Sequence, residues 1–161
     1  MRTIALHKVV ARSKIRRVLD RERRAGRHIV FTNGCFDLLH AGHVKLLQKA
    51  RSLGDVLVVG LNSDSSVRRL KGAGRPLAPA ADRAIVLGAL ACVDYVVTFG
   101  EDTPLNLIRQ VRPDVLVKGG DYKLNEIVGA EFVRQRGGTV RRFRLVPGRS
   151  TSTLMRRIRE L

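Results

Sequence analysis

The sequence is poor in the residue types that define several protein classes. Only two of its 161 residues are cysteine, Cys35 and Cys92, and they lack the spacing of metal ligands. This scarcity excludes a disulfide scaffold and predicts reduced thiols in the cytosol. The longest apolar run without a charge, residues 84–93, is too short to cross a bilayer, and the N-terminus has no signal-peptide pattern. We therefore expect a cytoplasmic protein with no membrane segment.

Acidic and aromatic side chains are also scarce. The chain has 14 Asp and Glu residues but 31 Lys and Arg residues, and the resulting net charge of +17 is concentrated in residues 1–28 and 134–161. Such an excess can bind nucleic acid or polyphosphate. Binders of single-stranded nucleic acid also need exposed aromatic platforms, and the chain has five Phe, two Tyr and no Trp. An RNA-binding module is therefore a remote alternative, and charge spread over solvated helix faces is favoured.

The length and composition of the sequence indicate one ordinary globular domain, because 161 residues suit a single core and 44% of them are hydrophobic. Apolar, β-branched runs predict strands over 29–32, 56–60, 95–99, 115–117 and 140–145. Amphipathic patterns predict helices over 13–25, 43–53, 104–111, 126–136 and 152–160. This alternation predicts an α/β fold, a doubly wound, mostly parallel five-stranded sheet with helices on both faces. We expect one domain over 1–161, with a basic helical extension at 1–27 and the catalytic core at 28–161.

The segment after the first predicted strand carries a pattern with chemical meaning. Ligands of such sheets bind beyond the carboxyl ends of the strands, and residues 32–43 lead from that strand into a helix. Gly34 permits a close backbone approach, and Gly42 leaves the helix start unobstructed for a phosphate. His40 and His43 are three residues apart and can donate hydrogen bonds to a phosphoryl group as negative charge builds on it.

Two other interpretations of this histidine pair are open. An isolated histidine is more often a hydrogen-bonded structural residue than a catalytic one, although two histidines that frame a glycine at a strand-to-helix junction weaken this interpretation. A zinc pair would need a third Cys, His or acidic ligand at recognisable spacing, which the sequence lacks. We therefore predict no protein-bound metal.

The sequence GCFDLLHAGHVKLL, residues 34–47, resembles the HxGH signature of the nucleotidyltransferase superfamily, whose members share a Rossmann-like, cytidylyltransferase-like fold. The resemblance implies an enzyme in which an acceptor phosphate attacks the α-phosphorus of a nucleoside triphosphate and pyrophosphate leaves. No protein nucleophile takes part, so catalysis consists of positioning and charge stabilisation. The resemblance also implies that Mg²⁺ accompanies ATP.

A second segment, RSTSTLMR near the C-terminus, resembles the ISSTxxR pattern of the same superfamily. It implies that Ser150, Thr151 and Ser152 open a helix and bind β- and γ-phosphate oxygens, although simple N-capping explains the same residues. The basic position of the pattern falls on Met155, with Arg156 one place later. We expect Met155 to pack in the core.

Further phrases narrow the resemblance. The chain resembles the family of D-glycero-β-D-manno-heptose 1-phosphate adenylyltransferases in its short motifs NSD, LKG, RP, VLGAL, EDTP and LVKGGDY. Members of this family also form half of the bifunctional heptose kinase/adenylyltransferases. The resemblance implies that the partners are ATP and a sugar 1-phosphate, and that AMP is transferred to give ADP-heptose and pyrophosphate. It implies a stand-alone form that works with a separate heptose kinase and phosphatase. It also allows a homodimer, since dimers are common in the superfamily.

The same resemblance implies a set of site residues. We expect His40, His43 and Lys45 to be catalytic. The nucleotide is expected to contact Asn33, Gly34, Phe36, Gly42, Lys118, Gly119 and Asp121, in addition to the C-terminal hydroxyls. The acceptor is expected to contact Asn62, Asp64, Lys71, Arg75 and Arg83. Arg83 stands out because a cation at a helix start opposes the helix dipole and is better explained by a ligand. Asp37 is expected to cap or brace the loop.

One alternative keeps the chemistry and changes the substrate. Glycerol-3-phosphate cytidylyltransferases and archaeal FAD synthetases share the HxGH pattern and have a similar length. Nothing in the quoted residues physically distinguishes adenine from cytosine, so the choice of base follows from family likeness alone.

Overall fold

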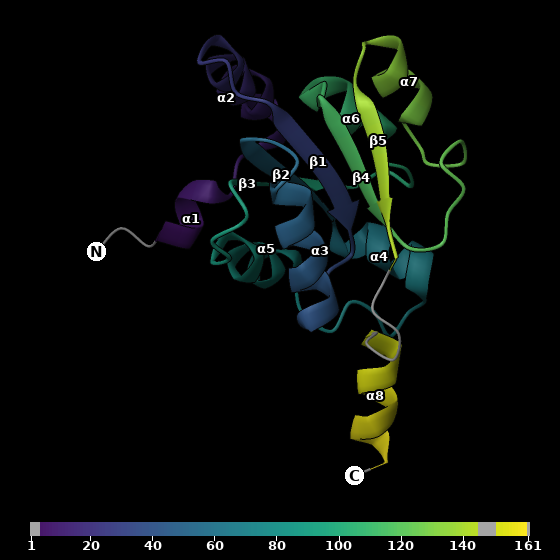
Figure 1. Cartoon of the computed structure of the whole chain (residues 1–161). Coiled ribbons are helices and arrows are strands. Elements are labelled where there is room, and N and C mark those ends of the chain that lie inside the picture. The colour runs from purple at the N-terminus through teal and green to yellow at the C-terminus, as the bar shows by residue number, and fades with distance from the viewer. Residues whose placement is uncertain (1–3, 145–150, 161) are drawn as a thin grey trace.

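The protein is built on a five-stranded parallel sheet. The computed structural model describes residues 4–144 and 151–160. Its strands are β1 (Ile29–Gly34), β2 (Val56–Asn62), β3 (Tyr95–Phe99), β4 (Val115–Gly119) and β5 (Thr139–Phe143). They lie in the order β3-β2-β1-β4-β5, and every neighbouring pair is parallel (Figure 1). The predicted five-stranded α/β sheet is therefore confirmed, and all of its pairings are parallel.

Helices cover both faces of this sheet. In chain order the helices are α1 (Ile4–Lys8), α2 (Arg12–Arg24), α3 (Ala41–Arg51), α4 (Asp64–Lys71), α5 (Ala80–Gly88), α6 (Leu105–Val111), α7 (Ala130–Gln135) and α8 (Thr151–Arg159). Buried residues of α2, α6 and α7 pack with one face of the sheet in a first core cluster. Buried residues of α3 and α5 pack with the other face in a second cluster. This two-sided burial explains why β2 is buried at every position.

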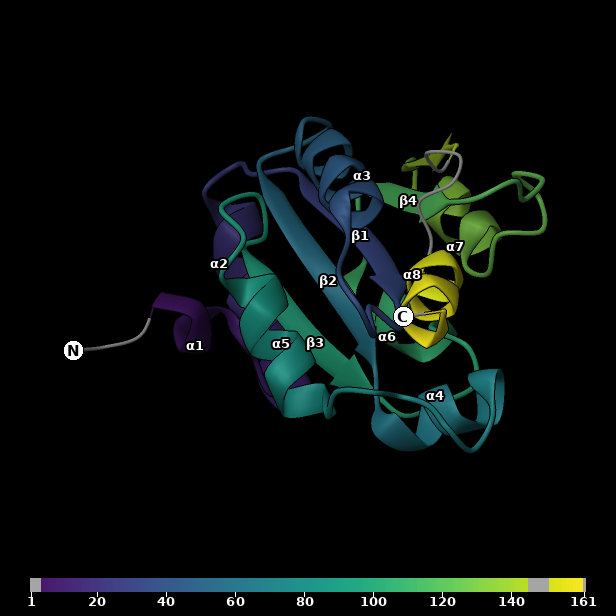
Figure 2. The same ribbon diagram turned by 90° about the horizontal axis from the view of Figure 1, so that it is seen from below.

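The strand order places a topological switch point between β1 and β4. The chain proceeds outward from β1 through β2 to β3, then returns to the other side of β1 for β4 and β5. Ligands of open α/β sheets bind at such a point, beyond the carboxyl ends of the strands. Figure 1 shows the strand arrowheads at the lower end of the molecule, where α4 and α8 also lie. Figure 2 looks onto this end, with α8 and α4 in front of the sheet.

Element boundaries differ from the predicted ones mainly at glycines and caps. The predicted helix at 126–136 begins only at Ala130, because Gly129 adopts a left-handed conformation with φ of 86°. Helix α4 follows a Ser63 cap, whose hydroxyl accepts from the backbone N–H of Ser66. Within α4 only Val67 and Leu70 are apolar, so the sequence gives little helical periodicity there. Helices α1 and α4 were not among the predicted elements. Helix α5 was expected only through a helix start at Arg83, and it begins three residues earlier, at Ala80.

The basic helix α2 belongs to the same packed unit as the sheet. Ile15 and Leu19 are fully buried in the first core cluster, although most of the other α2 side chains are charged. Just before α2, the backbone N–H of Val10 donates to the carbonyl of Val96 on β3 at 2.9 Å. Residues 12–24 therefore contribute to the core rather than extending from it. No helix within the described residues is long and apolar enough to cross a membrane.

Candidate active site

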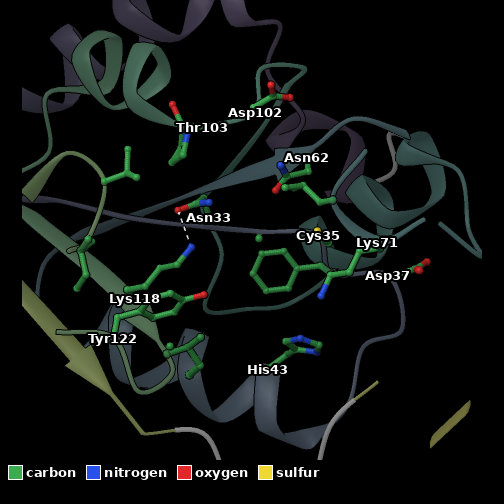
Figure 3. Close-up of a pocket in the computed structure, with 18 of the residues that line it drawn as sticks. Asn33, Cys35, Asp37, His43, Asn62, Lys71, Asp102, Thr103, Lys118 and Tyr122 are labelled. Atoms are coloured by element: carbon green, nitrogen blue, oxygen red, sulfur yellow. Dashed lines mark hydrogen bonds between the residues drawn. The ribbon is translucent and has the colours of Figure 1, made fainter. Parts of the chain in front are cut away.

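A pocket of about 570 Å³ opens at the carboxyl edge of the sheet (Figure 3). The ends of β1, β2 and β4, the start of α3, the end of α4, the first residue of α8 and the loops after β3 and β4 all contribute to its lining. Ten residues expected from the sequence line it, namely Asn33, Gly34, Phe36, His43, Asn62, Lys71, Arg75, Lys118, Gly119 and Thr151. The switch point therefore brings together residues that lie more than 100 positions apart in the sequence.

The two histidines at the start of α3 hold each other in a fixed geometry. His40 is the N-cap, and its Nδ1 accepts from the backbone N–H of Gly42 at 3.1 Å. The Nδ1 of His43 accepts from the backbone N–H of His40 at 3.4 Å, and the two rings stack with centroids 3.9 Å apart. A neutral imidazole that accepts at Nδ1 carries its proton on Nε2. The cap therefore presents His43 to the pocket as an Nε2–H donor.

His43 is kept neutral by its surroundings. Burial, with a smaller contribution from the neighbouring His40, lowers the pKa of His43 to about 4. Phe36 contributes to this burial, since its ring centroid lies 5.2 Å from that of His43. Gly34 makes room for the Phe36 ring, because a Cβ at position 34 would lie 3.0 Å from it. The segment between β1 and α3 is thus shaped around an uncharged donor at a helix N-terminus, which favours a phosphate oxygen.

Two lysines supply positive charge around this donor. In the view of Figure 3, Lys71 and Lys118 reach the pocket from opposite sides. The Nζ of Lys118 lies 3.4 Å from Asn33 Oδ1, and burial lowers the pKa of Lys118. Lys71 makes no hydrogen bond or ion pair with any residue that the structure describes, so its charge is available to an anionic ligand.

Arg75 is tied to Asp37 at the edge of the pocket. Its Nε donates to the Asp37 carboxylate, which also accepts from the backbone N–H of Leu77 at 2.7 Å. Burial opposes the ionisation of Asp37, but these hydrogen bonds outweigh it and hold its pKa below the usual range. Asp37 therefore braces the loop before α5, as expected. The expectation that Met155 packs in the core needs correction, because its Sδ lies 2.9 Å from Arg75 Nη1 and the residue is only half-buried.

Comparison with known proteins identifies the family. Residues 31–153 match the model of the cytidylyltransferase-like family. The chain belongs to this family. It is a nucleotidyltransferase, and its pocket lies where the members of such α/β folds bind their ligands.

Curated relatives carry the name bifunctional protein HldE. The protein of that name from Syntrophotalea carbinolica is 60% identical over 151 residues, which cover 94% of this chain and 31% of the relative. The one from Acidiphilium cryptum is 57% identical over 155 residues, which cover 96% of this chain and 32% of the relative. The chain of this nucleotidyltransferase therefore spans about a third of the length of these relatives.

Solved structures are also similar to this chain in fold. The lipopolysaccharide core biosynthesis protein from Thermoplasma volcanium superposes with a TM-score of 0.60 and 30% identity, over 75% of this chain and 98% of that one. A pantoate-β-alanine ligase from Francisella tularensis also superposes with a TM-score of 0.60, over 89% of this chain and 68% of that one. Its identity is only 14%, so this second similarity concerns the fold alone.

Arg83 has a different role from the one expected. Its side chain is 1% exposed, and it donates to the carbonyls of Ala78, Cys35 and Asn62 and to the Asp64 carboxylate. These bonds join the ends of β1 and β2 to the start of α4 and turn the guanidinium toward the protein. We therefore assign Arg83 and its partner Asp64 to the structural support of the nucleotidyltransferase site, instead of to substrate contact.

Other expected residues lie beside the pocket or outside the description. His40 and Gly42 form the cap without lining the cavity. Lys45 is exposed, because two positions along α3 from His43 turn it about 200° around the helix. Asp121 is exposed beyond the end of β4 and does not line the pocket. Ser150 and the side chain of Ser152 lie outside the described part of the chain.

Several lining residues were not expected from the sequence, namely Cys35, Leu46, Leu70, Asp102, Thr103, Pro104, Tyr122, Glu126, Ile127 and Val128. Most come from the loops after β3 and β4, which contain the EDTP and GGDY phrases. The position of these loops at the carboxyl edge was the available signal. Among the described residues, no three His, Cys, Asp or Glu side chains cluster closely enough to hold a metal, so the zinc interpretation finds no third ligand there.

Proposed function

We propose that this nucleotidyltransferase transfers AMP from ATP to D-glycero-β-D-manno-heptose 1-phosphate, giving ADP-heptose and pyrophosphate. The similarity to HldE proteins over most of the chain supports a heptose phosphate adenylyltransferase role. A separate kinase and a phosphatase would act before this step to supply the 1-phosphate. The choice of adenine and of the heptose follows from this similarity, whereas the transfer chemistry follows from the pocket.

The observation that carries the chemistry is the neutral His43 at the start of α3. Its Nδ1 is occupied by the His40 backbone, so its Nε2–H is the group available to a nucleotide. In the proposed reaction this group donates to a non-bridging oxygen of the α-phosphate, on which charge accumulates as the acceptor attacks. The donor is already oriented before the substrate arrives, so little reorganisation is needed during the reaction.

Lys118 and Lys71 are proposed to compensate the negative charge of the triphosphate and of the acceptor phosphate, respectively. Lys118 lies beside Asn33 at the switch point, where the triphosphate would pass, and Lys71 at the end of α4 is placed to hold the acceptor phosphate. Holding two anions next to each other requires such compensation, because their repulsion would otherwise oppose in-line attack. In the proposed reaction a Mg²⁺ ion arrives bound to the triphosphate. When bound, this ion neutralises charge on the leaving pyrophosphate.

Pyrophosphate release tests the proposal. The protein is incubated with Mg²⁺, heptose 1-phosphate and ATP, CTP, GTP or UTP in separate reactions, and release with ATP alone is expected. Release with CTP instead would retain the chemistry and overturn the proposed base. If no pyrophosphate is released with any of the four nucleotides, the assignment of heptose 1-phosphate as the acceptor is wrong.

Two histidine variants test the assignment of the donor. Replacing His43 by alanine is expected to lower kcat about 10²–10³-fold, since one oriented donor to the transition state is lost. The exposed His7 on α1 provides the matched control, and His7→Ala is expected to retain full activity. Circular dichroism checks that both variants are folded. Full activity of folded His43→Ala would contradict the role of His43. An RNA-binding module would instead release no pyrophosphate, and its affinity for RNA would fall steeply with salt and be unchanged by His43→Ala.

A further inference from the structure

The loop after β3 forms a wall of the pocket to which no role has yet been given. Asp102, Thr103 and Pro104 line the cavity there. Figure 3 shows Asp102 and Thr103 on the opposite side of the pocket from His43, with Asn33 between them. Asn62, at the end of β2, lies next to this wall in the same view. The wall is therefore far from the phosphate donor and belongs to the β2 and β3 side of the switch point.

Helix α4 and α2 hold this loop in place. Arg69 Nε donates to Asp102 Oδ1 at 2.7 Å, and the same guanidinium donates to the carbonyl of Gly100. Ser66 Oγ donates to the carbonyl of Glu101 at 3.2 Å, and the Glu101 carboxylate pairs with Arg12 at 2.6 Å. A loop fixed at successive residues can present side chains in a defined geometry, which recognition of a small polar ligand requires.

The wall offers hydrogen-bonding groups that the protein leaves unused. Asn62 is only 4% exposed, and its amide nitrogen donates to Ser66 Oγ, so its Oδ1 is the group turned to a ligand. Within the described residues, Asn62 Oδ1, Asp102 Oδ2 and the Thr103 hydroxyl make no hydrogen bond. Two of these three groups are acceptors only, and the third can donate or accept.

This set of groups favours hydroxyls over phosphates. Sugar hydroxyls can donate to an amide or carboxylate oxygen, and the Thr103 hydroxyl can complete the pairing. At neutral pH a phosphate monoester is mostly doubly ionised, so it is a poor donor, and the Asp102 carboxylate would repel it. The free cation Lys71 lines the same cavity and provides a separate place for the phosphate. The pocket thus has a phosphate part and a hydroxyl part.

We propose that Asn62, Asp102 and Thr103 form the subsite for the hydroxyl groups of the acceptor, a polyhydroxylated sugar whose phosphate is held by Lys71. This inference rests on the proposed transfer to a sugar 1-phosphate and adds the residues that select the sugar. A ligand that lacks a hydroxyl opposite Asn62 leaves the oxygen of this buried amide unpaired, whereas the exposed Asp102 and Thr103 side chains can bind water instead, so we expect Asn62 to discriminate most strongly.

Steady-state kinetics with heptose 1-phosphate and ATP test the subsite. Thr103→Val removes the hydroxyl with little change of shape and is expected to lower kcat/KM for the sugar phosphate about 5–10-fold. Asp102→Asn keeps an oxygen for Arg69 and is expected to lower kcat/KM about 3–10-fold, because a charge-assisted bond is lost from a side chain that is 73% exposed and screened by water. Both losses should appear in the KM for the sugar phosphate, with the KM for ATP changed less than twofold. Thr139→Val, at an exposed position of β5, is the matched control.

The outcomes separate the two proposals. A wild-type protein that releases no pyrophosphate from ATP with heptose 1-phosphate overturns the proposed function, and the sugar subsite falls with it. An active wild type with Thr103→Val and Asp102→Asn both equal to Thr139→Val overturns the subsite alone. A rise in the KM for ATP instead of the sugar phosphate would show that the wall binds the nucleotide ribose, which also overturns it. If Asp102→Asn fails to fold by circular dichroism, Thr103→Val decides the question.

Discussion

Replacing Arg83 by methionine tests whether this buried guanidinium holds the active-site edge together. The side chain donates to three backbone carbonyls and to the Asp64 carboxylate, at distances of 2.6–2.9 Å. Methionine fills similar space but donates nothing. A net value of about 1 kcal/mol for each lost hydrogen bond gives about 4 kcal/mol, which agrees with the 3–5 kcal/mol typical of breaking a buried pair. We expect the free energy of unfolding to fall by about 3–5 kcal/mol.

Urea unfolding followed by circular dichroism measures this loss. Arg109→Met on α6 is the matched control, because Arg109 is exposed and makes no side-chain hydrogen bond with the described residues. Its effect should stay within about 0.5 kcal/mol. Asp64→Asn should cost no more than about 1 kcal/mol, since the Asp64 side chain is 34% exposed and water can replace its partner. Most of the Arg83 effect is therefore assigned to the carbonyls.

Two results would refute this reasoning. If Arg83→Met is folded and within about 1 kcal/mol of Arg109→Met, the carbonyls of Cys35 and Asn62 have found other partners and Arg83 does not hold them. If Asp64→Asn costs as much as Arg83→Met, the ion pair dominates and the carbonyl bonds contribute little. Arg83→Lys provides a graded intermediate, because one ammonium cannot reach all four acceptors at once.

Two further predictions concern His43 and α2. By NMR titration, His43 should have a pKa of about 4, and His40→Ala should raise it but leave it below 6.5, since burial is the larger cause of the shift. The contribution of His43 to stability is then complete above about pH 6.5 and is lost as the pH falls toward 4, and an unshifted titration near 6.5 would contradict the described packing. Leu19→Ala should lower the free energy of unfolding by about 2–5 kcal/mol in urea, because Leu19 is fully buried. A loss below about 1 kcal/mol would mean that α2 is not part of the core.

The sheet was predictable because its strands obey local rules. A strand such as β2 is apolar from Val56 to Leu61 and ends at the polar Asn62, so its pattern alone indicates burial on both faces. The histidine pair was predictable for a related reason, since a glycine between two histidines after a strand is a local signal. What the pattern could not supply is the state of these histidines. Their tautomer and the low pKa of His43 depend on the mutual capping and on the Phe36 ring.

Residues whose role depends on tertiary contacts were harder to assign. A basic residue in the first turn of a helix looks unfavourable locally, and a ligand was the natural explanation for Arg83. The structure supplies another explanation, because the carbonyls that Arg83 binds come from positions up to 48 residues away. The wall formed by Asp102 and Thr103 escaped assignment for the opposite reason. Both residues lie in a short sequence typical of a turn. They line the pocket only because that loop packs against α4.

Tertiary contacts also account for part of the high number of basic residues. On α2, Arg12 pairs with Glu101 and donates to Gln110, while Arg23 donates to the carbonyls of Val111 and Arg112 at the end of α6. A cation at a helix C-terminus is favoured both by the free carbonyls and by the helix dipole. These arginines fasten α2 to α6 and so help to hold the loop that carries Asp102. A high count of basic residues therefore does not require a polyanionic partner, since some of that charge is already used to position the wall of the pocket.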